Sequence, residues 1–208
     1  MTQRTAPGMT DYGLLAILAV LWGLAFPLSK IAVEGYPPVT LTFARQIVAV
    51  AVLVLFVLLL RRQWRRPDAP ELVAIAACSV FGSVLPFTLI NWGVEEIDSG
   101  LAAILMGFMP LLTIVLAHMF TADDKLSVPK VIGVLLGLLG LCILFWPALV
   151  IGGDTLWRQI ALIGAAACYA INALVIRSLT HWPPLILLTY IGFGTLALLF
   201  PLSFILEQ

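Results

Sequence analysis

Seven long apolar stretches, separated by short polar or proline-rich segments, make up the hydrophobic pattern of the chain. Each stretch is close to the ~20 residues that an α-helix needs to cross a bilayer core of about 30 Å. None shows the alternation of apolar and polar positions that marks the strands of a membrane β-barrel. We therefore predict an all-α fold, a polytopic bundle of transmembrane helices. The predicted spans lie near residues 12–34, 39–60, 71–92, 99–121, 129–147, 158–178 and 184–206.

The composition agrees with this pattern. Hydrophobic residues make up 62% of the chain and charged residues 11%, whereas soluble domains contain about 25% charged residues. We therefore expect the lipid bilayer to be the main solvent of the protein. The formal net charge is zero, so charge gives no indication of a nucleic-acid partner. Cys78, Cys142 and Cys168 stand alone in apolar runs, so we interpret them as packing residues and not as disulfide partners or metal ligands.

Positive charge concentrates in one predicted loop, which holds Arg61, Arg62, Arg65 and Arg66. Loops rich in Lys and Arg stay on the cytoplasmic side of a membrane. This rule places the N-terminus in the cytoplasm and Gln208 outside. We predict a multi-pass protein of a plasma membrane, such as a bacterial inner membrane.

An internal repeat relates the first two predicted spans to the last two. Tyr36-Pro37-Pro38 recurs as Trp182-Pro183-Pro184 after a shift of 146 residues. One unit would then contain five helices, an odd number, so the next unit enters the membrane with inverted topology, as in many secondary transporters. We predict a five-helix unit in residues 1–148 and the first two helices of a second unit in residues 149–208.

A complete second unit would extend to about residue 294, three helices further than the sequence given. The repeat therefore predicts one of two arrangements: the sequence is a fragment of a longer protein, or helices from another chain complete the fold, with a homodimer as one form of this second arrangement. The alternative is a seven-span protein without a repeat.

Several segments resemble, in order along the chain, those of EamA-like members of the drug/metabolite transporter superfamily. The first span contains Leu21-Trp22-Gly23-Leu24-Ala25-Phe26, and the second begins with Pro37-Pro38 followed by Phe43-Ala44-Arg45. The similarity continues through residues 91–146, where Asp124 occupies a position that is usually Glu in the family. The resemblance implies a fold of two inverted five-helix repeats that moves small metabolites, often outward.

Arg45 is the charged residue that lies most clearly inside a predicted span. A charge at the centre of a membrane helix costs about 2.5–3.5 kcal/mol on insertion scales, and less near the ends. One interpretation is a cavity cation that meets a carboxylate or another anion. The other is an arginine whose long side chain reaches the outer interface. The family resemblance favours the cavity.

Five further residues are candidate contacts of a small organic solute. An amide in hydrocarbon needs a hydrogen-bond partner, which is either the solute or a neighbouring helix. Aromatic side chains within spans suit the wall of a solute site, although helix packing explains them almost as well. The candidate substrate-binding residues are Arg45, Asn91, Asn172, Trp22, Phe26 and Tyr169.

Proline and glycine positions predict the local helix geometry. Pro27, Pro86 and Pro110 lie inside predicted spans, where each removes a backbone hydrogen bond and favours a kink. Interrupted helices often border the substrate site of transporters. Three glycines of the fifth span have the spacing of close helix contacts: Gly133, Gly137 and Gly140.

The absence of several chemical motifs from the sequence reduces the number of possible functions. No Asp or Glu lies in the middle of a predicted span, and no catalytic constellation or phosphate-binding loop is evident. We therefore predict no enzyme and no cofactor or metal. The leading hypothesis is a secondary transporter, an exporter or facilitator of small metabolites such as amino acids or related organic solutes. The alternative is a seven-helix receptor or sensor; its rhodopsin form would need a Schiff-base lysine, which residues 184–206 do not contain.

Overall fold

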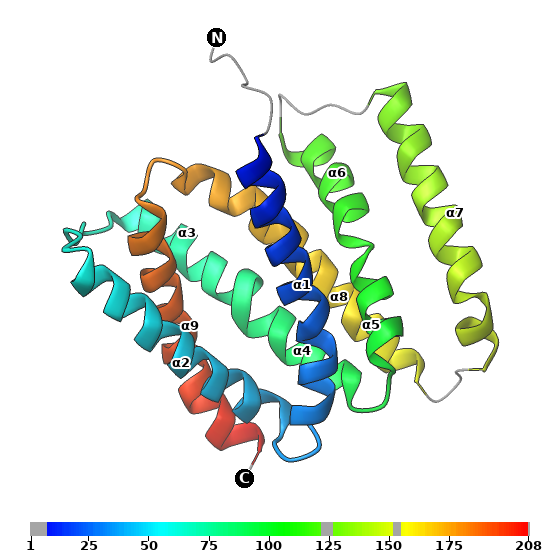
Figure 1. The fold of residues 1–208 in the computed structure, drawn as a ribbon, viewed down its shortest axis with the longest axis horizontal. Helices are drawn as coiled ribbons and strands as arrows, with labels where there is room; N and C mark the ends of the chain where they lie inside the picture. Colours follow the sequence, from blue (N-terminus) through cyan, green and yellow to red (C-terminus); the bar gives the residue numbers. More distant parts are fainter. Residues whose placement is uncertain (1–7, 122–126, 152–154, 208) are drawn as a thin grey trace.

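The computed structural model describes residues 8–121, 127–151 and 155–207, with the backbone alone at residues 138, 141, 142 and 144–151. The described residues form helices and no strand, which confirms the all-α prediction (Figure 1). A π-helical segment, Val80–Val84, lies between α3 and α4, and a 3-10 segment, Ile176–Leu179, follows α8. The α-helices are α1 (Met9–Ala32), α2 (Pro38–Leu59), α3 (Ala69–Ser79), α4 (Leu85–Val94), α5 (Ser99–Met106), α6 (Met109–Phe120), α7 (Val128–Ile151), α8 (Leu156–Val175) and α9 (Pro184–Leu206).

Six helical spans among the described residues are long and apolar enough to cross a membrane. They are Met9–Ala32, Pro38–Leu59, Ala69–Val94, Ser99–Phe120, Leu156–Leu179 and Pro184–Leu206. The fifth predicted span corresponds to α7, whose described apolar part is Val128–Gly137. The count of seven spans therefore stays a prediction. Asp124 and Gln208 lie outside the described residues, and so does the side chain of Cys142.

Local sequence signals explain where several helices begin. Pro38 and Pro184 occupy the first position of α2 and α9, where the missing N–H of proline removes no intrahelical bond. Asp68 and Glu71 form a capping box at the start of α3. In it, the Asp68 carboxylate accepts from Glu71 N at 2.8 Å, and the Glu71 carboxylate accepts from Asp68 N at 3.0 Å. Asp98 caps α5 by accepting from a backbone N–H at 2.8 Å.

Two predicted spans are interrupted next to their prolines. The π-helical segment separates α3 from α4, and Pro86 is the second residue of α4. In the next span α5 ends at Met106, and Pro110 is the second residue of α6. Proline has no N–H to bond to the preceding turn, so the helix restarts at both places. Pro27, in contrast, lies inside α1, which continues through it.

The first two and the last two helices run in opposite directions. α1 runs opposite to α8, and α2 packs beside α9 in the opposite direction (Figure 1). The carboxylate of Glu207, after α9, accepts from Val39 N at 2.7 Å and Thr40 N at 2.6 Å at the start of α2. These directions suit an inverted relation between the two pairs of helices, while the division into two repeat units stays a prediction.

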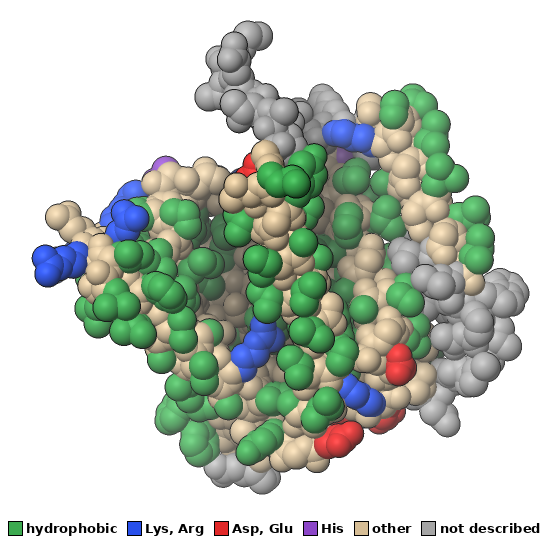
Figure 2. Space-filling model, viewed as in Figure 1, with side chains coloured by type: hydrophobic (Ala, Val, Ile, Leu, Met, Phe, Trp, Pro, Cys, Tyr) green, Lys and Arg blue, Asp and Glu red, His purple; other side chains and the backbone are tan. Residues whose placement is uncertain are grey.

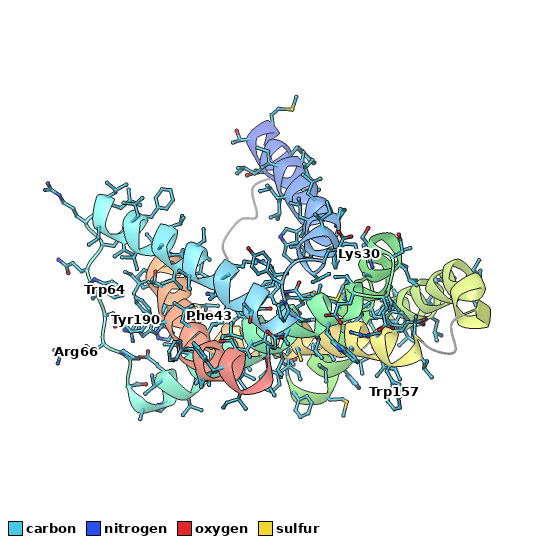
Figure 3. The ribbon with its side chains drawn as sticks, turned by 90° about the horizontal axis from the view of Figure 1, so that it is seen from below. Lys30, Phe43, Trp64, Arg66, Trp157 and Tyr190 are labelled. Carbon is cyan, nitrogen blue, oxygen red and sulfur yellow. The ribbon has the colours of Figure 1, made fainter. Side chains whose placement is uncertain are left out.

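The helix α1 leans away from the layer that the other helices form (Figure 3). None of its residues is buried, although Lys30 Nζ near its end donates to the backbone oxygen of Glu95 at 2.9 Å. Its antiparallel counterpart α8 packs against α4, α5 and α6 and contributes several buried residues to the core. Hydrophobic side chains cover much of the visible face of the molecule (Figure 2), as helices that face lipid require.

Glycines bring several helices into close contact. A Cβ added at Gly192 of α9 would lie 2.6 Å from Val50 Cγ2 of α2, and one added at Gly93 of α4 would lie 2.8 Å from Leu162 Cγ of α8. The packing predicted for α7 is correct only at Gly137, where an added Cβ would lie 3.3 Å from Leu111 Cδ2. At the other two predicted glycines, 133 and 140, an added Cβ meets no described atom within 4 Å. Those two positions face open space because their side of α7 has no neighbouring helix among the described residues.

Clusters of charged residues connect loops to helix ends at both ends of the bundle. At one end, Glu71 Oε1 accepts from Arg65 at 2.5 Å and from Trp182 Nε1 at 3.0 Å, and it lies 2.8 Å from His181 Nε2. This cluster joins the α2–α3 loop, the start of α3 and the loop before α9.

At the other end, Arg158 of α8 pairs with Glu95 at 2.5 Å and with Glu96 at 2.6 Å. Its guanidinium also lies over the ring of Trp92, 4.1 Å from the centroid. This cluster fastens the start of α8 to the end of α4 and to the α4–α5 loop.

Candidate functional site

A cavity of about 700 Å³ lies between α1 and the helices behind it, where the surface is hollowed (Figure 2). Residues from α1, α2, the π-helical segment, α4, α5, α6 and α8 line it. Its volume lies within the range of small-molecule sites, which are mostly apolar and carry a few placed polar groups. The polar side chains in its wall are those of Ser29, Arg45 and Tyr169.

Of the described residues that line the cavity, Arg45 is the one that carries a charge. Its guanidinium lies over the ring of Phe87, with Cζ 3.8 Å from the centroid. Among the described residues it has no acidic partner and no hydrogen-bond acceptor. A cation–π contact contributes about 0.5–2 kcal/mol. The arginine therefore lines the cavity with the Phe87 ring beside it and with no acidic partner among the described residues.

Phe87 is a cavity residue that the sequence analysis missed. Phe87 lies on α4, and its ring contacts the guanidinium of Arg45. The same ring meets that of Tyr169 in a T-shaped contact with centroids 6.1 Å apart. Arg45, Phe87 and Tyr169 thus form one stack, the Arg45 stack, across α2, α4 and α8. The sequence signal that could have found Phe87 is its position directly after Pro86, at the restart of an interrupted helix.

Both interrupted spans border the cavity. Gly82 of the π-helical segment lines it, and so do Gly107 and Pro110 at the junction of α5 and α6. Single-turn π segments inside α-helices occur frequently at functional sites. Here the interruption brings the backbone of α3–α4 close to α8, because a Cβ added at Gly82 would lie 2.8 Å from Asn172 Oδ1.

The two candidate amides have different environments. Asn172 Oδ1 is buried and accepts no hydrogen bond from a described residue, next to the cavity residue Gly82. Asn91 is 2% exposed, and its Nδ2 donates to Thr42 Oγ1 at 3.0 Å. Asn91 does not line the cavity, so its geometry favours the helix-packing interpretation, with α4 joined to α2.

The remaining two candidates, Trp22 and Phe26, lie one turn apart on α1, and both line the cavity. Trp22 is 61% exposed, so its ring is accessible to a solute or to lipid. The structure thus brings Arg45, Trp22, Phe26 and Tyr169 to one cavity and places Asn172 behind its wall.

A family model described as the EamA-like transporter family matches residues 11–146. This chain belongs to the EamA-like transporter family. The match covers α1 to α6 and most of α7, which include every helix that lines the cavity except α8. With its membrane-spanning helices, this EamA-like chain is a multi-pass membrane protein.

Several curated relatives of the EamA-like chain carry transporter or exporter names. An uncharacterized transporter of Archaeoglobus fulgidus is 26% identical over 67% of this chain and 49% of its own length. Protein PagO of Salmonella typhimurium is 27% identical over 76% of this chain and 52% of its own length. A probable terminal-alkyne amino-acid exporter of Streptantibioticus cattleyicolor is 31% identical over 52% of this chain and 36% of its own length. The chain spans about half the length of the relatives that it matches, and none of these names supports the receptor alternative.

The fold has a counterpart among solved structures. A crystal structure, described only as that of a protein, superposes with a TM-score of 0.68 over 97% of this chain and 69% of the other. The sequence identity is 18%, so the likeness concerns the fold alone.

The Asn91–Thr42 contact gives a prediction that separates packing from solute contact. Thr42→Val removes a buried hydroxyl that donates to Pro38 O at 2.7 Å and accepts from Asn91. We expect a loss of about 1 kcal/mol in the free energy of unfolding, measured by detergent denaturation, with solute affinity unchanged. A loss of solute affinity at unchanged stability would return Asn91 and Thr42 to the binding site.

Proposed function

We propose that this EamA-like chain takes part in secondary transport, as an exporter or facilitator, of small metabolites such as amino acids or related organic solutes. The observation that carries the proposal is the cavity between the apolar helices, in whose wall Arg45 stands without a charged partner among the described residues. An uncompensated charge inside a membrane helix is costly and marks a solute or ion pathway. The relative named as a probable amino-acid exporter supports the choice of solute.

We propose a plasma membrane as the location, with the N-terminus and the loop of Arg61 in the cytoplasm, because of the Lys and Arg bias. Cysteines placed at Gln63 and Ser99, in a background without the natural cysteines, test this orientation. We expect an impermeant maleimide to label position 99 from outside intact cells, and position 63 only after the cells are opened. Labelling of position 63 in intact cells would reverse the topology.

We also propose that α8 and α9 repeat α1 and α2 in inverted orientation. Their first residues support this, since Pro184 follows Pro38 by the 146 residues of the sequence repeat. If α1 and α8 are equivalent, α1 should have neighbours like those that α4, α5 and α6 provide to α8. We therefore propose that further helices, from a longer form of this chain or from a second chain, cover α1 in the transporting form.

A flux assay tests the proposed function. Cells or vesicles contain the chain alone, or the chain with the second-unit helices of an EamA-like relative. We expect saturable flux of amino acids or related solutes when α1 is covered, and little flux from the chain alone. The absence of saturable flux for every solute, with correctly inserted protein in both formats, would contradict the proposal.

A further inference from the structure

The contacts of the Arg45 guanidinium, and the hydrogen-bond donors that they leave free, indicate which solutes the cavity accepts. Its guanidinium contacts the face of the Phe87 ring at 3.8 Å, and Tyr169 supports that ring from its edge. Such a contact uses one face of the planar guanidinium and leaves its five in-plane N–H donors available. No described residue accepts a hydrogen bond from these donors, so the group that satisfies them comes from the content of the cavity.

The geometry of guanidinium selects the acceptor. Its rigid fork of donors matches carboxylate and phosphate, which accept two parallel hydrogen bonds. Arg45 is the one charged residue in the lining, so the cavity compensates a single negative charge. A phosphate monoester carries nearly two negative charges at pH 7, and the second would stay uncompensated among apolar walls. A carboxylate carries one.

The rest of the wall determines the body of the solute. The helix α1 contributes Leu21, Trp22 and Phe26 to the wall, and α5 and α6 contribute Met106 and Met109. These side chains offer aromatic and flexible apolar surface. Among the described residues, no acidic side chain lines the cavity to attract a cationic group.

We propose that the cavity selects solutes with one carboxylate on an apolar body, and that Phe87 is the positioning residue that presents the Arg45 guanidinium to this carboxylate. The inference rests on the proposed function only in taking the cavity as the solute site. Its test measures equilibrium binding and not flux. A failure of selectivity is thereby distinguishable from a failure of transport.

The experiment compares three ligands of one shape that differ in charge: 3-phenylpropanoate, 3-phenylpropanamide and 3-phenylpropylammonium. The full chain is embedded in nanodiscs of phosphatidylcholine, and affinity is measured by calorimetry. We expect the carboxylate to bind at least about tenfold more tightly than the amide, since a hydrogen-bonded charge contributes at least that factor. The ammonium ligand should bind most weakly.

Two substitutions of Arg45 and one control assign the preference to its guanidinium. Arg45→Gln should bring the carboxylate-to-amide affinity ratio close to one, and Arg45→Lys, which keeps the charge but not the fork, should give an intermediate ratio. Arg62→Gln removes an exposed loop charge and should leave the ratio unchanged. If Arg45→Gln fails to fold, the carboxylate-to-amide affinity ratio of Arg45→Lys tests the proposal instead. A ratio equal to that of the parent chain would show that the paired donors of the guanidinium are not needed, and would overturn their role.

Phe87 has its own test. Phe87→Leu should lower the affinity ratio several-fold while amide binding changes little, because only the carboxylate depends on the orientation of Arg45. Phe87→Tyr, which restores the ring, should restore the ratio. An unchanged ratio in Phe87→Leu would overturn the positioning role.

Two further outcomes overturn the substrate class. One is equal affinity of the parent chain for the carboxylate and the amide. The other concerns lipid, because an anionic headgroup could offer the same chemistry to Arg45. If the carboxylate preference disappears when phosphatidylglycerol is added to the nanodiscs, a headgroup is the partner of Arg45; persistence of the preference supports a free solute.

Discussion

Arg45→Ala should reduce flux at least about tenfold while insertion and expression stay close to those of the parent chain. The expected size follows from the loss of a charged hydrogen-bonding group in an apolar wall, which costs about 1.5–3 kcal/mol of binding. Insertion should not suffer, because removal of a charge from a membrane helix makes insertion easier. Initial flux rates of the chain together with the second-unit helices, normalised to the amount of inserted protein, measure the effect.

The same assay separates the two interpretations of Arg45. If its side chain only reaches the interface, Arg45→Lys and Arg45→Ala should both match the parent, because neither changes the cavity. Arg62→Ala in the loop is the matched control for loss of a positive charge. Equal flux in all four proteins would remove Arg45 from the site.

Gly192→Leu should prevent α9 from packing against α2 and lower the free energy of unfolding by about 3 kcal/mol or more. An added Cβ at this position would lie 2.6 Å from Val50 Cγ2 and 3.3 Å from Gln46 Nε2. Overpacking of a tight contact costs about 1–3 kcal/mol even for small additions, and leucine adds three further carbons. Detergent denaturation of the purified chain gives the unfolding free energy.

Gly133→Leu is the matched control, since an added Cβ there meets no described atom within 4 Å. Leucine at position 133 should leave stability within about 0.5 kcal/mol of the parent chain. If both variants lose the same amount of unfolding free energy, the loss comes from placing leucine in a helix. The close contact between α2 and α9 would then not explain the loss in Gly192→Leu.

The helices could be predicted from the sequence because a membrane leaves few alternatives. Backbone groups in hydrocarbon must bond within their own helix, so an apolar stretch of sufficient length is a helix. The prediction for residues 184–206 coincides with α9, Pro184–Leu206. Pro86 and Pro110 also indicated where two spans are interrupted.

The neighbours of each helix could not be predicted in this way. A membrane helix is apolar on its lipid side and on its protein side, so apolar periodicity does not show which side packs. Gly133 and Gly192 are both helical glycines in apolar surroundings, yet only Gly192 meets another helix among the described residues. The two glycines differ in their distance from a neighbouring helix, which the residue type does not reveal.

The sequence identifies those residues of the candidate site whose type is rare in membrane helices. Arg45 could be identified because charges inside spans are few. Phe87 has only its position after Pro86 as a signal, because phenylalanine is common in apolar spans and the role of Phe87 depends on Arg45 from another helix. Asn91 and Asn172 are both amides in apolar spans, and the sequence does not show that Asn91 bonds to the Thr42 hydroxyl while Asn172 Oδ1 has no partner among the described residues.

A cysteine at Ala103 tests most directly whether solute passes through the cavity. Ala103 lines the cavity, and Gln63→Cys in the α2–α3 loop is the control, both in a background without the natural cysteines. We expect a maleimide at position 103 to stop flux, solute to slow that labelling, and labelling at position 63 to leave flux unchanged. Complete labelling of position 103 with unchanged flux and no protection by solute would contradict the assignment of this cavity as the solute path.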